Sequence, residues 1–220
     1  RDPEMSRGLG DVYKRQINTL PAYMFENCVK LQNVQFPMKV KTLGSYIFSG
    51  CTLLENVRIP DTVRDIGERA FIYCKSLRTI VIPEGVTEIK KYTFYGCEGL
   101  VNITIPETVK IIGLCAFDEC ILLVKIVLPK QMTKIDAYAF EQCTALQKIA
   151  LPEGIPAIEA SSFRNCVSLQ AVYIPASVKK VNSEAFRGCK SLSYVYFGGS
   201  EEMWNNIVIS TDATLSLIHI

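Results

Sequence analysis

The cysteines are the residues of this chain whose type and spacing offer the most chemistry. The sequence has nine of them, and eight recur every 23 residues without an insertion or deletion. These eight are Cys28, Cys51, Cys74, Cys97, Cys120, Cys143, Cys166 and Cys189. Thiols in a regular series can pair as disulfides, ligate zinc or act as nucleophiles, and each use needs its own geometry.

The spacing of these cysteines opposes both disulfides and zinc. A fixed period of about 20 to 50 residues indicates stacked units, in which equivalent Cβ atoms lie ~4.8 Å or more apart, beyond the roughly 3.5–4.5 Å of a disulfide. A structural zinc site needs four converging ligands, generally close cysteine pairs or histidines, which the repeats lack. We therefore predict that the cysteine column fills the core. Cys115 lies outside the column, at the position of Tyr46, Tyr92 and Tyr138, and we expect it to be partly exposed.

The two ends of the chain are related through their coding sequences. Residues 11–16 read DVYKRQ, and the reverse complement of one DNA sequence that encodes them translates as LSLIHI, the sequence of residues 215–220. Such a relation is typical of a sequencing-library adapter. We interpret residues 1–16 and 215–220 as adapter-derived or non-native tails and exclude them from the fold. His219, the single histidine, lies in an excluded tail.

Carboxylates are the remaining candidates for chemistry. The acidic members of the column that follows the repeat prolines are Asp61, Glu84, Glu107 and Glu153, with Lys130 interrupting them. Calcium takes about six to eight oxygens, and one carboxylate per repeat cannot converge on an ion. The column therefore indicates solvated turns. We predict no catalytic residue, metal site or cofactor, and we expect the repeats not to be an enzyme.

The charge pattern excludes further classes. Lys and Arg total 24 against 22 Asp and Glu, and the two signs are interspersed. Polyanion binding favours a strongly basic stripe, so we predict no nucleic-acid partner. No apolar run approaches the length of a membrane span, so we expect no membrane insertion in this segment.

The repeat unit reads L-x-x-[VI]-x-[ILF]-P-x-x-[VMI]-x-x-[IL]-G-x-x-A-F-x-x-C-x-x. Ile80 and Ile82 alternate with Thr79 and Val81, which predicts a short strand. The proline that follows ends this strand. The next apolar pair in the unit indicates a turn or a very short second strand.

The second half of the unit should turn back on itself. Glycines at 44, 67 and 113 suggest a bend with permissive dihedral angles. Phe94, Cys97 and Leu100, at i, i+3 and i+6, suit one or two turns of α-helix or 3₁₀ helix. Strands of successive units then stack as a parallel ladder. The predicted structural core ladder includes Phe71, Phe94, Phe117 and Phe140 with Cys74, Cys97, Cys120 and Cys143.

The L-x-x-I-x-I-P and A-F-x-x-C elements resemble the BspA-like branch of the leucine-rich repeats. The resemblance covers about residues 17–198, or about eight 23-residue repeats. It implies an α/β, right-handed leucine-rich-repeat solenoid with a parallel strand ladder on the concave face and short helical or 3₁₀ turns on the convex side. It also implies a bacterial cell-surface or secreted protein with an interaction role. Residues 199–214 resemble the start of a C-terminal capping element, truncated here, with Ser200 as a helix N-cap and Trp204 over the last rung.

Strand residues that point away from the core should line the concave face. Along the repeats the residues of this face are first polar, then basic in two repeats, and finally aromatic. Its candidate ligand-binding residues are Tyr173, Tyr194, Tyr196, Lys125, Lys148 and Arg58. Tyrosine is frequent at binding hot spots, although it also favours strands for their own sake.

A second candidate surface lies in the fifth unit. Its members are apolar where other units are polar or variable, and they are Ile111, Leu114, Ile121, Val124 and Val127. Exposed together they would form an interface patch; the alternative is that they are spread over two faces.

These features predict a non-enzymatic module that binds a protein or glycan, for example on a host surface or matrix, through the concave sheet. The alternative is a structural spacer that presents another domain outside this segment. A catalytic domain tethered beyond the segment is a third possibility.

Overall fold

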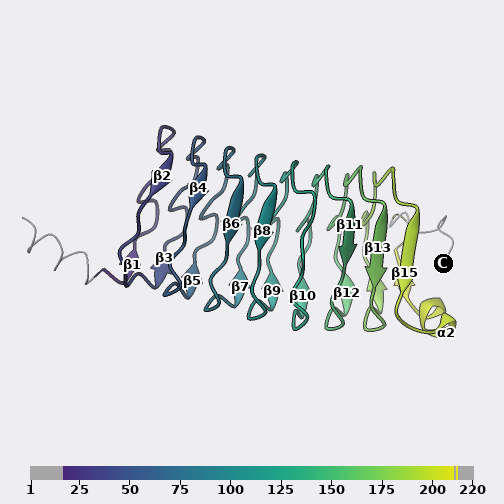
Figure 1. The fold of residues 1–220 in the computed structure, drawn as a ribbon. Coiled ribbons are helices and arrows are strands. Elements are labelled where there is room, and N and C mark those ends of the chain that lie inside the picture. Colours follow the sequence, from purple (N-terminus) through teal and green to yellow (C-terminus); the bar gives the residue numbers. More distant parts are fainter. Residues whose placement is uncertain (1–16, 211, 213–220) are drawn as a thin grey trace, which may run out of the picture.

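The computed structural model describes residues 17–210 and 212, and these form a stack of similar coils (Figure 1). The prediction that residues 1–16 and 215–220 are non-native falls outside the described residues. Most coils contribute two short strands that pair in parallel with the equivalent strands of neighbouring coils. The predicted solenoid of parallel strands is thus confirmed.

The first ladder is made by the strands that precede the repeat prolines. These are β2 (Asn33–Val34), β4 (Asn56–Val57), β6 (Thr79–Val81), β8 (Asn102–Thr104), β11 (Lys148–Ala150), β13 (Ala171–Ile174) and β15 (Tyr194–Phe197). In β6 the side chain of Ile80 is buried while Thr79 and Val81 are exposed, as the alternation predicts. Every first-ladder strand therefore offers one face to the core and one to solvent.

The second ladder confirms the very short second strand. It comprises β1 (Thr19–Leu20), β3 (Thr42–Leu43), β5 (Asp65–Ile66), β7 (Glu88–Ile89), β9 (Ile111–Ile112), β10 (Lys134–Ile135), β12 (Ala157–Ile158), β14 (Lys180–Val181) and β16 (Val208–Ile209). In every strand of this second ladder except β16, the second residue is buried.

The prediction of helical or 3₁₀ turns on the second half of the repeat is wrong. Tight turns occupy these positions instead. Tyr92 and Gly96, on either side of Phe94, have φ angles of 57° and 67°. Such left-handed residues cannot continue a right-handed helix. The N–H of Phe94 instead donates to the carbonyl of Ala116 in the next coil, at 2.9 Å. Bonds of this kind to the next coil alternate with bonds inside the coil, such as that from the N–H of Cys97 to the carbonyl of Phe94 at 3.1 Å.

The reason for the recurrent glycine also differs from the prediction. The glycines with positive φ are Gly50, Gly96 and Gly188, not those at 44, 67 and 113. A Cβ on Gly67 would lie 2.3 Å from the backbone nitrogen of Ser45. Close approach of adjacent coils, rather than dihedral freedom, therefore explains glycine at this position.

Phenylalanine rings form a continuous stack through the core. The centroids of Phe71 and Phe94 are 5.5 Å apart with rings 8° from parallel, and Phe94 stacks on Phe117 at 5.4 Å. Their side chains are fully buried, as are those of Cys74 and Cys97. All nine cysteines are free, and only Cys28, in the first coil, is exposed.

The last coil ends in a short helix. Helix α2 (Glu201–Asn205) has Ser200 as its N-cap, whose hydroxyl accepts a hydrogen bond from the N–H of Met203 at 3.2 Å. The Trp204 ring packs edge-on against Phe197 at 5.3 Å. After α2 the chain returns to the second ladder, where β16 pairs with β14.

Candidate binding surface

The first ladder is interrupted in the fifth coil. Its strands form two separate sheets, β2-β4-β6-β8 and β11-β13-β15. Residues 124–128 form no strand, although Lys125 makes an isolated bridge with Lys148. In Figure 1 the coil between β8 and β11 accordingly has no arrow in this ladder. Ile126 and Leu128 still point into the core, so the interruption changes the backbone rather than the packing.

A hollow of about 640 Å³ opens on the solvent face beside this interruption. Its lining residues come from the fifth coil and from the three coils that follow. Among them are Lys125, Val127, Lys148, Ala150, Tyr173 and Tyr196. Val127 is 66% exposed, which leaves an apolar surface open to solvent.

Three tyrosines form the aromatic end of this face. Tyr173 and Tyr196 are register partners in β13 and β15. The Tyr194 and Tyr196 rings stack with centroids 6.2 Å apart and planes 8° from parallel. Tyr194 and Tyr196 are more than half exposed, and Tyr173 is about one third exposed. Large, rigid aromatic surfaces of this kind are suited to contact with a ligand.

The hydroxyl of Tyr173 is oriented by a carboxylate. It donates a hydrogen bond to Glu153 Oε1 at 3.3 Å. Desolvation, and then the negative charge of Glu153, raise the pKa of Tyr173. The phenol therefore stays neutral at physiological pH and retains its hydrogen-bonding proton.

Two lysines form the basic end of the face. Lys125 and Lys148 are exposed and occupy the same position in adjacent coils. Within residues 17–210, no ion pair involves either amine. Four other lysines (Lys75, Lys90, Lys91 and Lys134) each have a carboxylate within 3.2 Å.

The six candidate ligand-binding residues do not all lie together. Lys125, Lys148, Tyr173 and Tyr196 line the hollow, and Tyr194 adjoins it through its stack on Tyr196. Arg58 follows β4, three coils before Val127 in the same column, and is not among the lining residues. Val127 was predicted only as part of the apolar patch of the fifth unit, and Gln147 and Ala150 were not among the candidate site residues. The hollow itself could not be predicted, because the interruption of the ladder changes neither the length nor the consensus residues of the unit.

The five apolar residues of the fifth unit occupy different parts of the coil. Val124 and Val127 line the hollow. Ile111 belongs to β9 in the second ladder, Leu114 lies in the turn after β9, and Ile121 lies on the turn side after Cys120. The structure thus assigns two of them to the candidate binding surface.

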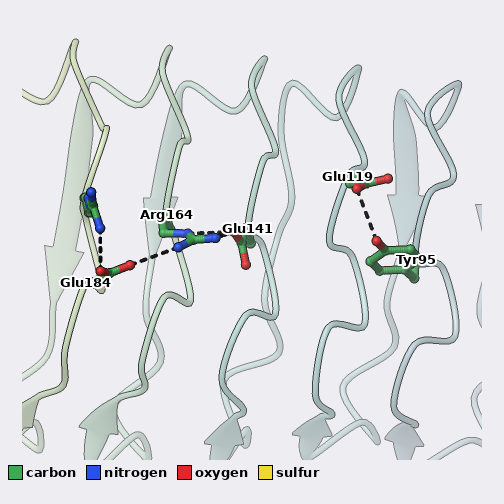
Figure 2. Close-up of polar contacts among 6 residues, drawn as sticks. Tyr95, Glu119, Glu141, Arg164 and Glu184 are labelled. Atoms are coloured by element: carbon green, nitrogen blue, oxygen red, sulfur yellow. Dashed lines mark hydrogen bonds and ion pairs between the residues drawn. The ribbon is translucent and has the colours of Figure 1, made fainter.

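A polar cluster on the turn side was not predicted. Figure 2 shows Arg164 between two carboxylates, with its Nε 2.6 Å from Glu141 Oε1 and its Nη1 3.0 Å from Glu184 Oε2. Two coils before Glu141, the hydroxyl of Tyr95 donates to Glu119 of the following coil at 3.1 Å. Glu141 is buried, so its pairing with Arg164 offsets the cost of removing its charge from water.

Asp118 lies one coil before Glu141 and is 6% exposed. Its Oδ1 atom has no hydrogen-bond partner among the described residues. Burial, and then the charge of Glu141, raise the pKa of Asp118 to about 7. The ionised form of this carboxyl is therefore disfavoured in the folded chain.

Cys115 is buried, contrary to the expectation of a partly exposed thiol. Its position lies on the turn side, where its thiol interacts with Tyr92 and Asp118. Burial, and then the charge of Asp118, raise the pKa of this thiol to about 11. A thiol that remains protonated is a poor nucleophile.

No group of three or more His, Cys, Asp or Glu side chains within residues 17–210 and 212 could hold a metal ion. In the same part of the chain, no helix has the length and hydropathy to cross a membrane.

Solved structures resemble this fold. A leucine-rich repeat protein from Bacteroides ovatus is 31% identical with a TM-score of 0.71, over 76% of this chain and 45% of that protein. A leucine-rich repeat protein from Eubacterium ventriosum is 20% identical with a TM-score of 0.53, over 83% of this chain and 58% of that one. The pneumococcal vaccine antigen PcpA is 15% identical with a TM-score of 0.52, over 86% of this chain and 62% of that one. No match was found among curated proteins.

The chain therefore spans less than half the length of the Bacteroides ovatus protein. The model of the BspA type leucine rich repeat region matches six copies, over residues 12–123 and 65–193. This match covers most of the chain and includes the cysteine and phenylalanine columns of the core. The chain belongs to the BspA-type leucine-rich repeat family.

Proposed function

We propose that this chain is a non-enzymatic binding module of a bacterial surface or secreted protein, and that it contacts a protein or glycan through the first-ladder face. The surface or secreted location is inferred from family membership. We further propose that residues 17–198 form the repeat body and that residues 199–214 begin a capping element.

One observation carries the proposal: aromatic and apolar side chains remain exposed around a hollow in an otherwise regular ladder. The core columns account for the repeated residues, so Tyr173, Tyr194 and Tyr196 are not needed to fill the coil. A concave surface lined by apolar and aromatic groups with a few polar ones is the usual form of a ligand site. The hollow combines this lining with two lysines and the Tyr173 hydroxyl.

The test is a triple variant, Tyr173→Ala, Tyr194→Ala and Tyr196→Ala, screened against arrays of extracellular-matrix proteins and glycans. We expect the affinity for a ligand of the native chain to fall by about 30-fold or more, because truncation of a hot-spot aromatic costs about 2 kcal/mol or more. The double variant Tyr194→Ser and Tyr196→Ser, which leaves Tyr173 with its Glu153 contact, should show a smaller loss.

The matched control replaces three exposed tyrosines of the turn side, Tyr23→Ala, Tyr73→Ala and Tyr138→Ala. It should bind as the native chain does. If the first-ladder variants keep their fold by circular dichroism and bind as well as the native chain, the proposal is wrong and the spacer interpretation is favoured.

A further inference from the structure

The lysine pair of the hollow carries an inference that rests on the function proposed above. We propose that the ligand is an acidic peptide segment of a protein partner. Its carboxylates meet Lys125 and Lys148, and an apolar or aromatic side chain of the same segment meets Tyr173 and Tyr196.

The charge of the pair supports an anionic ligand. Lys125 and Lys148 are bridged neighbours in parallel register, and like charges at such neighbouring positions repel. Both side chains are exposed, and no carboxylate within residues 17–210 pairs with them. A bound carboxylate pair would remove this repulsion, which gives an acidic ligand an advantage over a neutral one.

The surrounding positions leave this positive charge uncompensated. At the first-ladder positions of the adjacent coils the outward residues beside the lysines are uncharged, and they are Val101, Asn102, Thr104, Gln170 and Ala171. The carboxylates that follow the repeat prolines in these coils face other donors and form no ion pair with either lysine. Glu107 accepts the backbone N–H of Lys130 at 2.9 Å, and Glu153 accepts the hydroxyl of Tyr173.

The lining favours a peptide over a sugar chain. Apart from the lysines and tyrosines, the outward residues of the lining are Val124, Val127, Ala150 and Ala171, with Gln147 as the polar exception. Sugar hydroxyls lose their hydrogen bonds to water on such a surface, and few side chains here could replace them. An apolar peptide side chain incurs no such cost and gains from the burial.

The distance between the lysine pair and the tyrosine pair sets the spacing of the acidic and apolar residues in the peptide. Lys125 and Lys148 lie two coils before Tyr173 and Tyr196 in sequence order, so their centres are separated by roughly 10 Å at the ladder spacing of ~4.8 Å. An extended peptide advances about 3.3 Å per residue. The acidic and apolar residues of the ligand should therefore be about three positions apart.

The probe is a set of short synthetic peptides with an Asp-Glu pair and a Phe at increasing separations in a Gly/Ser background. Companion sets replace Asp-Glu by Asn-Gln or by Lys-Lys. We expect the acidic peptides with a separation of about three residues to bind about tenfold more tightly than their amide counterparts. This advantage should shrink as NaCl rises from about 50 mM to about 500 mM, because the charges are exposed to screening.

A charge-reversal variant identifies the lysines as the cause. Lys125→Glu combined with Lys148→Glu should lose the acidic peptides and gain the Lys-Lys set. The matched control, Lys179→Glu with Lys180→Glu, makes the same change of net charge at exposed residues in and next to β14 of the second ladder. It should retain the preference for acidic peptides. Unfolding midpoints of both variants report on the fold.

The outcomes separate this inference from the proposed function. An acidic set that binds no better than the amide set, or a preference that survives Lys125→Glu with Lys148→Glu, overturns the inference. If peptide binding still depends on the tyrosines, the proposed function stands. If a sulfated heparin fragment binds through the lysines and no peptide binds, the acidic-peptide inference is also overturned, and an anionic glycan is the ligand instead. If no peptide or glycan depends on the tyrosines, both proposals fail.

Discussion

At the scale of the residue, the cysteine column shows why this side chain suits the core. The Sγ of Cys97 donates to the carbonyl oxygen of Phe71 at 3.1 Å, and Cys120 and Cys143 make the same contact one and two coils later. A thiol is apolar enough for a buried site and still supplies a weak donor. The repeat pattern predicts that these residues are buried. It does not predict the hydrogen bond, because no sequence signal marks a backbone carbonyl as its acceptor.

Thiol labelling tests this account directly. Burial raises the pKa values of Cys74, Cys97, Cys120, Cys143 and Cys166. In the native chain we expect Ellman's reagent to modify Cys28 quickly, and these five only after denaturation. Fast reaction of several thiols in the folded chain would contradict the buried column.

A pH series tests Asp118. The pKa of this carboxyl is about 7 in the fold against an ordinary value of 3.8. A raised pKa means that its contribution to stability is present below about pH 4 and is lost as pH rises through about 7. Asp118→Asn should therefore gain stability relative to the native chain between about pH 5 and pH 8, by roughly 1 to 4 kcal/mol in urea unfolding. Asp61→Asn, at an exposed turn, is the control. If the change in unfolding free energy relative to the native chain does not vary with pH for either variant, Asp118 is not buried as described.

At the scale of the element, the strands and core columns could be predicted, and the turns could not. Alternation in Thr79–Val81 and the following Pro83 determine the first strand. Apolar spacing at i, i+3 and i+6 is shared by a helix and by a pair of left-handed turns, so Phe94, Cys97 and Leu100 could not distinguish them. The deciding contacts, such as the N–H of Phe94 to Ala116, join residues of different coils.

The stack of rings predicts an unequal cost of truncation. Phe94 is fully buried between Phe71 and Phe117, whereas Phe25 is half-buried and stacks on Phe48 alone within the described residues. Phe94→Ala should lower the free energy of unfolding by about 3 to 5 kcal/mol, and Phe25→Ala by roughly half as much or less. Urea denaturation measures both, and equal losses would argue against a stack in which central coils have two interfaces.

The interruption of the first ladder in the fifth coil predicts faster amide exchange there. Residues 124–128 form no strand, whereas Asn102–Thr104 and Lys148–Ala150 do. The amides of 124–128 should exchange with deuterium faster than those of β8 and β11, because fewer of them are held in ladder hydrogen bonds. Equal protection along all the rungs would show that the ladder is continuous in solution.

At the scale of the whole molecule, the repeat period already indicates a stack in which each coil contacts its neighbours, and the family match agrees with it. The period does not reveal the hollow, because the fifth unit keeps both its length and its core residues. The outward residues differ from repeat to repeat, and only the folded structure shows that Lys125, Val127, Tyr173 and Tyr196 share one surface. The candidate site is thus a property of adjacent coils rather than of any single motif.

Hydrogen–deuterium exchange, measured with and without the tightest-binding array ligand or peptide, tests the central claim that the first-ladder face is the binding surface. The account predicts added protection confined to residues 124–128, 147–150, 171–174 and 194–197. Protection on the turn side instead, around residues 92–97 and 115–120, would place the partner on the opposite part of the coil and contradict the account.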